Sequence, residues 1–100
     1  MIIDLTKLKV QPSLLEEPKE VDANDVIADL IWKECAKNDI QKANFALKLL
    51  NTKGEIEITK EEASYIMETT SVMKYWLAKA LEDLIKSKMQ EEIEKNENNS

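Results

Sequence analysis

The sequence contains no histidine, and all fourteen of its basic residues are lysines, so arginine is absent as well. Histidine is the commonest general base and the commonest metal ligand in proteins. Arginine is the usual residue for bidentate contacts to phosphate and guanine. These absences argue against the familiar schemes of acid–base catalysis and against sequence-specific reading of DNA. We therefore expect a protein that is not an enzyme and that uses no cofactor and no metal.

Glycine and cysteine occur once each, at Gly54 and Cys35. One glycine cannot build a glycine-rich phosphate loop. One cysteine excludes an internal disulfide, and we expect Cys35 to be a small buried hydrophobic residue on a helix. No apolar run approaches the roughly 20 residues of a membrane span, and the basic-then-apolar pattern of a signal peptide is absent. We expect a cytoplasmic protein with no membrane contact.

The chain has 100 residues, of which 43% are hydrophobic and 34% charged, and its net charge is −6. This is the composition of one ordinary globular domain. The negative charge disfavours binding to nucleic acids. We expect a single helical α+β domain over residues 1–95, followed by a disordered tail over residues 96–100.

The stretch GEIEITKEEA, residues 54–63, predicts a strand that runs directly into a helix. Apolar and acidic residues alternate from Glu55 to Ile58, as in a strand with one face buried. Thr59 and Glu62 match a capping box, in which each side chain accepts a hydrogen bond from the other residue's amide. Gly54 is expected to end the preceding helix in the left-handed conformation. The strand needs a partner, and we expect it to pair with a strand at residues 2–8.

Residues 11–21 carry both prolines and are predicted to be a connector, with Leu14 and Leu15 packed down as an anchor. A first helix is expected to begin at Asp22 or Asn24. Asp39 is expected to cap a second helix from Ile40 to about Leu50. Spacings of three and four residues predict the buried faces of the two helices. For the first helix these residues are Val26, Ile27, Leu30, Ile31 and Cys35, and for the second Ile40, Ala43, Ala46, Leu47 and Leu50.

A long helical region follows, from Lys60 towards Lys95. Residues 69–71, Thr-Thr-Ser, interrupt it with hydroxyl side chains that compete for main-chain hydrogen bonds. We expect a break there, with Ser71 capping a fourth helix; an unbroken helix with coiled-coil spacing is the alternative. The predicted fold is α+β and mostly helical, in the order strand-helix-helix-strand-helix(-helix) with a small two-stranded sheet.

Glutamates gather at positions 61, 62 and 68 and again at 91, 92 and 94. Carboxylates three or four residues apart share a helix face. Without histidine or paired cysteines beside them, we interpret both groups as solvated helix faces. The serines have no histidine to activate them as nucleophiles.

The aromatic pair Tyr75-Trp76 is the best functional indication in the chain. Adjacent helical positions point about 100° apart, so both rings cannot enter one small core. Tryptophan and tyrosine concentrate binding energy in protein interfaces. The alternative to an interface is that Trp76 is a core residue and Tyr75 lies at the edge of the core. The predicted partner-binding residues are Tyr75, Trp76, Leu84, Ile85 and Met89.

The layout of a short strand, a proline-bearing linker, two helices, GEIEITKEEA and a closing helix resembles small uncharacterised proteins of bacteriophages and integrated mobile elements. This resemblance implies a bacterial cytoplasmic setting and a role in association. It assigns no functional residue.

Three functions remain open from the sequence. The first is a non-catalytic interaction protein that self-associates or docks on another protein. The second is an acidic inhibitor that blocks a nucleic-acid-binding surface of a host protein. The third, disfavoured by charge, is a small DNA-binding regulator with a helix-turn-helix-like pair. The apolar face of the last helix extends past what two short helices can cover, which predicts a homodimer with the last helices packed together.

Overall fold

A computed structural model describes residues 1–98 of the chain, without the side chains of Cys35 and of residues 94–98. The predicted burial of Cys35 therefore lies outside what is described. Along the chain the elements are β1 (Ile2–Asp4), a 3-10 turn (Leu5–Lys7), β2 (Leu8–Val10), β3 (Lys19–Val21), α1 (Asn24–Leu30), a π-helical turn (Ile31–Cys35), α2 (Ile40–Thr52), β4 (Glu55–Glu57), α3 (Lys60–Glu68), a second 3-10 turn (Thr69–Val72) and α4 (Tyr75–Asn98).

The mostly helical α+β fold is confirmed, and so is the pairing of the N-terminal segment with the strand after Gly54. Strands β1 and β4 are antiparallel, with Ile3 opposite Ile56. Both isoleucines are buried, while the glutamates of β4 face solvent. The capping box is also formed: the Thr59 hydroxyl accepts from the Glu62 amide at 3.1 Å, and the Glu62 carboxylate accepts from the Thr59 amide at 2.9 Å.

The single strand predicted at residues 2–8 is instead divided in two by the first 3-10 turn. The Asp4 carboxylate begins this turn by accepting a hydrogen bond of 2.9 Å from the Thr6 amide. The turn buries Leu5 completely and changes the direction of the chain. As a result β1 and β2 belong to two different sheets.

The connector predicted at residues 11–21 is wrong in its last three residues, because β3 (Lys19–Val21) folds back to pair with β2. Val10 lies opposite Lys19, so residues 11–18 form the loop of a hairpin. The predicted anchor role of Leu14 and Leu15 is also wrong: their side chains are 93% and 97% exposed at this loop.

Asp39 caps α2 as predicted, accepting from the amides of Gln41 and Lys42. The predicted face of α2 is correct at Ala46, which is buried, and wrong at its three large residues. The structure exposes Ile40, Leu47 and Leu50 and buries a neighbouring face instead. Apolar residues occur on more than one side of α2, so spacing alone does not select the side that meets α1 and α3. The buried residues of α2 are Phe45, Ala46 and Leu49.

The expected helix break is present, as a 3-10 turn over Thr69–Val72. Ser71 does not cap α4; its hydroxyl donates to the Glu68 carbonyl at 3.1 Å, and α4 begins only at Tyr75.

The end of α2 also differs from expectation, because Lys53 takes the left-handed conformation with φ 37° while Gly54 has φ 148°.

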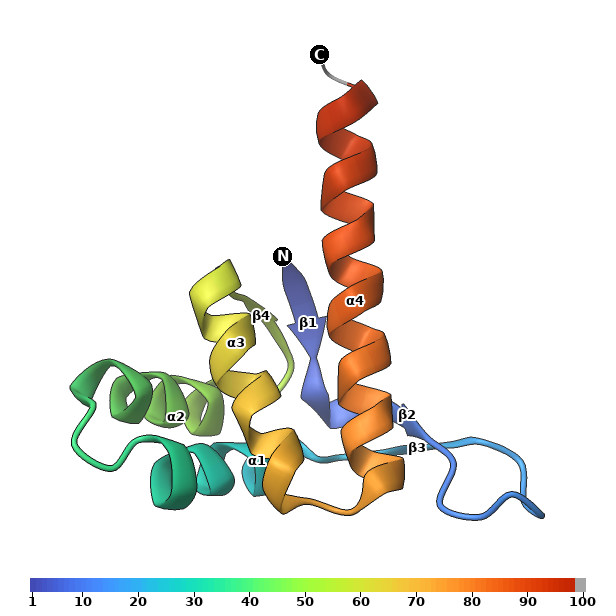
Figure 1. Ribbon diagram of the computed structural model, residues 1–100, viewed down its shortest axis with the longest axis horizontal. Coiled ribbons are helices and arrows are strands. Elements are labelled where there is room, and N and C mark those ends of the chain that lie inside the picture. Colours follow the sequence, from blue (N-terminus) through green and yellow to red (C-terminus); the bar gives the residue numbers. More distant parts are fainter. Residues whose placement is uncertain (99–100) are drawn as a thin grey trace.

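Helix α4 stands upright beside β1, and its C-terminal part projects away from the remaining elements (Figure 1). Its N-terminal part contacts β2, the second 3-10 turn and α3. The described part of α4 ends at Asn98, and residues 99–100 of the predicted tail lie outside the described residues.

One core joins both sheets to the helices: Ile3, Leu5, Leu8, Val10, Ala23, Ile27, Ala28, Ile31, Phe45, Ala46, Leu49, Ile56, Ile58, Ala63, Ile66, Leu81 and Ile85.

Candidate protein-binding groove

The first turn of α4 presents the two adjacent aromatic side chains to different surroundings. Trp76 is half-buried and packs against the core, whereas Tyr75 is 79% exposed. This division follows from the angle of about 100° between neighbouring helical positions. Trp76 therefore contributes to both the core and the surface, and Tyr75 lies wholly at the surface.

The other predicted partner-binding residues do not share one environment. Leu84 is half-buried and lines the same surface hollow as the two aromatic residues. Ile85 is only 2% exposed and belongs to the core, so it is not available to a partner. Met89 is half-buried against the core, outside this hollow. The structure thus brings together Tyr75, Trp76 and Leu84 and separates the remaining two.

The dimer with packed last helices was expected because two short helices cannot cover the whole apolar face of α4. Much of that face is covered within the chain, because α4 packs against β1 and β2. Sequence reasoning underestimated this cover because it treated the N-terminal segment as one strand of a single sheet. The segment instead supplies core residues from two strands and the turn between them: Ile3, Leu5, Leu8 and Val10.

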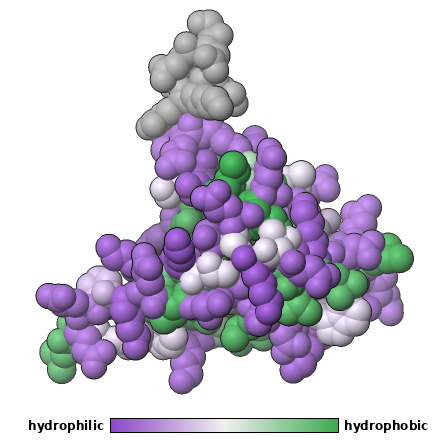
Figure 2. Space-filling model, turned by 180° about the vertical axis from the view of Figure 1, so that it is seen from behind, coloured by the Kyte–Doolittle hydropathy of each residue, from purple (hydrophilic) through white to green (hydrophobic). Residues whose placement is uncertain are grey.

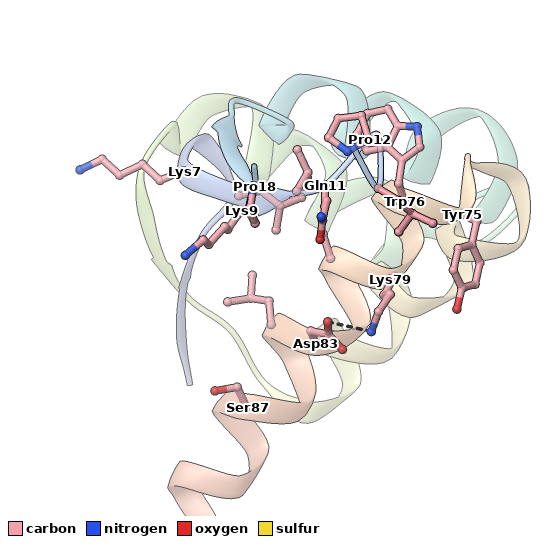
Figure 3. Close-up of a pocket in the computed structure, with 15 residues that line it drawn as sticks. Lys7, Lys9, Gln11, Pro12, Pro18, Tyr75, Trp76, Lys79, Asp83 and Ser87 are labelled. Atoms are coloured by element: carbon pink, nitrogen blue, oxygen red, sulfur yellow. Dashed lines mark hydrogen bonds and ion pairs between the residues drawn. The ribbon is translucent and has the colours of Figure 1, made fainter. Parts of the chain in front are cut away.

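A groove of about 800 Å³ runs between β2, the β2–β3 loop and the N-terminal half of α4. Trp76 of α4 lies next to Pro12 of the β2–β3 loop in this groove (Figure 3). Gln11 and Pro18 line the groove on the loop side together with Pro12. Most of its surface is apolar. The apolar residues that line it, besides the aromatic Tyr75, are Leu8, Val10, Pro12, Leu14, Pro18, Trp76, Ala80 and Leu84.

Lysine side chains border this groove although the chain as a whole carries a charge of −6. Lys7 and Lys9 are exposed and extend outward from the strand side (Figure 3). On the helix side Lys79 pairs with Asp83 at 3.2 Å. The groove therefore combines an apolar floor with a locally basic edge.

The strand wall of the groove depends on the turn that orients β2. The hydrogen bond from the Thr6 hydroxyl lowers the pKa of Asp4 below its ordinary value of 3.8. Burial acts in the opposite direction, while the Thr6 amide and the charge of Lys7 lower the pKa further. Asp4 is therefore held in its charged form, which is the form that accepts both hydrogen bonds at the start of the turn.

Sequence reasoning missed the strand side of the groove: Lys9, Val10, Pro12 and the loop leucines. One signal in the sequence could have indicated the exposure of Leu14 and Leu15. They lie between two prolines in a short polar segment, where they have few apolar neighbours with which to pack. The hairpin itself had no clear signal, because β2 and β3 are three residues each and the loop between them is long.

Two glutamates of the first cluster have structural partners. Glu62 caps α3, and the Glu68 carboxylate pairs with Lys42 at 2.8 Å. Across the residues that the structure describes, no group of three or more acidic or cysteine side chains is placed to hold a metal ion. No helix within residues 1–98 combines the length and the hydropathy needed to cross a bilayer.

Comparison of the chain with protein-family models, with curated proteins and with solved structures found no match. The resemblance to phage and mobile-element proteins therefore stays a prediction.

Proposed function

We propose that the protein is a non-catalytic interaction protein, and that the groove between β2, the β2–β3 loop and α4 binds an apolar and acidic segment of a protein chain. One observation carries this proposal: an apolar groove of about 800 Å³ has a tryptophan in its wall and lysines at its edge. The groove offers a partner both apolar and electrostatic contacts.

The apolar contacts come from side chains of α4. Trp76 is anchored by its contact with the core, so its ring presents a rigid surface. Tyr75 is exposed beside it and Leu84 is half-buried further along α4. A rigid aromatic side chain binds with little loss of conformational entropy, and such residues concentrate binding energy. Leucine-sized side chains fit this surface.

The electrostatic contacts come from the lysines at the edge of the groove. Within the described residues, neither Lys7 nor Lys9 takes part in an ion pair, whereas Lys79 is already paired with Asp83. Two exposed ammonium groups beside an apolar floor favour a ligand with carboxylates next to its apolar residues. Such charges at the edge of an interface contribute more to specificity and association rate than to affinity.

The test uses Trp76 as a fluorescent reporter in a Trp32→Phe background, which leaves it the only tryptophan. A synthetic peptide with two leucines followed by two glutamates is titrated at low protein concentration. We expect a saturable shift of the emission to shorter wavelength as the ring loses water. The same peptide with serines in place of the leucines should give no shift.

Two charge reversals provide a matched pair. Lys9→Glu changes the edge of the groove, and Lys60→Glu makes the same change at an exposed position outside it. We expect only Lys9→Glu to weaken binding. If instead the protein binds a lysine-rich peptide and releases it steeply with rising salt, the acidic-inhibitor function is supported and this proposal fails.

A further inference from the structure

The β2–β3 loop exposes two adjacent leucines at its tip. The side chains of Leu14 and Leu15 are 93% and 97% exposed. In Figure 2 the tip of this loop is a hydrophobic projection at the lower left, surrounded by hydrophilic residues. Leu14 lines the groove of its own chain, whereas Leu15 does not.

The loop is ordered by its own hydrogen bonds. The Ser13 hydroxyl accepts from the Leu15 amide at 3.2 Å, and the Ser13 carbonyl accepts from the Glu16 amide at 3.3 Å. The Gln11 side chain donates to the Glu16 carbonyl at 3.3 Å. Prolines at positions 12 and 18 restrict the backbone further. A loop that is already ordered loses less entropy when it binds, so its exposed leucines are presented in a binding-ready form.

The leucines are followed directly by Glu16 and Glu17, both exposed. Within the described part of the chain neither glutamate takes part in an ion pair. Apolar side chains next to free carboxylates are the chemistry that the groove fits: an apolar floor beside Lys7 and Lys9. The same chain therefore carries both a groove and a segment that matches it.

We propose that the groove is filled by residues 13–17 of a second copy of this chain, in a twofold dimer where each loop enters the other copy's groove. This inference rests on the proposed function and names the occupant of the same groove. In a twofold dimer the two contacts are equivalent, so both grooves and both loops are used and the assembly closes at two copies. Two reciprocal contacts also give a larger interface than either loop alone provides.

Sedimentation equilibrium from about 1 to 500 µM protein measures this association. We expect the mass to rise from the monomer value of 11.5 kDa towards twice that value. Leu15→Ser removes an exposed side chain that does not line its own groove, and it should raise the dimer dissociation constant at least about tenfold. Ile40→Ser is the matched control, since Ile40 is 74% exposed on α2 and lies outside the groove. It should leave the dimer unchanged.

A charge exchange tests the register of the contact. Lys9→Glu and Glu17→Lys should each weaken the dimer, and the chain that carries both changes should regain most of the lost affinity. A monomer at every concentration would overturn the inference. So would a dimer that persists in Leu15→Ser or that leaves the Trp76 emission unchanged on dilution. If the monomer still binds the leucine–glutamate peptide, the proposed function stands and only the self-association fails.

Discussion

The side-chain amide of Asn24 donates a hydrogen bond of 2.9 Å to the main-chain carbonyl of Leu49. Asn24 is the first residue of α1 and Leu49 lies among the last four residues of α2. The last four carbonyls of a helix lack partners within the helix. Because both residues are buried, water cannot replace this bond. The contact ties the beginning of one helix to the end of the next.

Asn24→Ala should therefore lower the free energy of unfolding by about 1–3 kcal/mol, since it leaves a buried carbonyl without its donor. Asn24→Asp keeps the shape but replaces the donor with an acceptor, so it should lose at least as much. Asn44→Ala, at an exposed position of α2, is the control and should be neutral or slightly stabilising because alanine favours helices. Urea unfolding measures all three. Equal stability of Asn24→Ala and Asn44→Ala would contradict this role of Asn24.

Thr6→Val should raise the pKa of Asp4 towards 3.8, because it removes the hydroxyl that contributes most to lowering it. In wild type the folded carboxyl has a lower pKa than the unfolded one. The stability that this difference provides is present above pH 3.8 and is lost as the pH falls through the lower folded pKa. The stability gap between wild type and Thr6→Val should therefore narrow on acidification. An NMR titration of the Asp4 carboxyl checks the pKa, with Thr52→Val as a control that should not move it.

Ile85 and Tyr75, both assigned to partner binding from the sequence, should respond very differently to truncation. Ile85→Ala removes a buried side chain and should cost about 2–5 kcal/mol of stability. Tyr75→Ala changes a side chain that is 79% exposed, and its effect should stay within about 0.5 kcal/mol. Thermal or urea unfolding at low protein concentration compares them. A mild effect of Ile85→Ala would mean that α4 does not pack on the core as described.

The parts of the fold that could be predicted depend on neighbouring residues. The capping box of Thr59 and Glu62 and the Asp39 cap are local patterns, and the alternation from Glu55 to Ile58 indicates which face is buried. Each involves main-chain groups only a few residues away. Tertiary neighbours were not needed to infer these elements.

The parts that could not be predicted depend on contacts between distant residues. The buried face of α2 is chosen by α1 and α3, so Phe45 and Leu49 are buried while Ile40 and Leu47 are exposed. For the candidate groove, the aromatic side on α4 was visible in the sequence. Its opposite wall was not, because strands of three residues carry little local signal and β2 contacts α4, which is more than 60 residues away in the sequence. Apolar loop residues usually pack inward, so the exposure of Leu15 was also unexpected.

The turn between α2 and β4 offers a stabilising substitution. Lys53 has φ 37°, in the left-handed region, where a side chain costs about 1–2 kcal/mol. Lys53→Gly removes that cost but adds about 0.5–1 kcal/mol of backbone entropy to the unfolded chain. The net result should be a gain of about 0.5–1 kcal/mol, measured by urea unfolding.

Two further variants show whether this gain comes from the backbone. Lys53→Ala keeps the positive φ and removes only an exposed ion pair with Asp25, 3.7 Å long, so it should be nearly neutral. Gly54→Ala should lose about 1–3 kcal/mol, because Gly54 has φ 148°. A Cβ at Gly54 would have no neighbour within 4 Å outside the adjacent residues, so this loss would come from the local backbone conformation and not from a clash with the rest of the fold. If Lys53→Ala gains as much as Lys53→Gly, the side chain and not the left-handed backbone is the source of the strain.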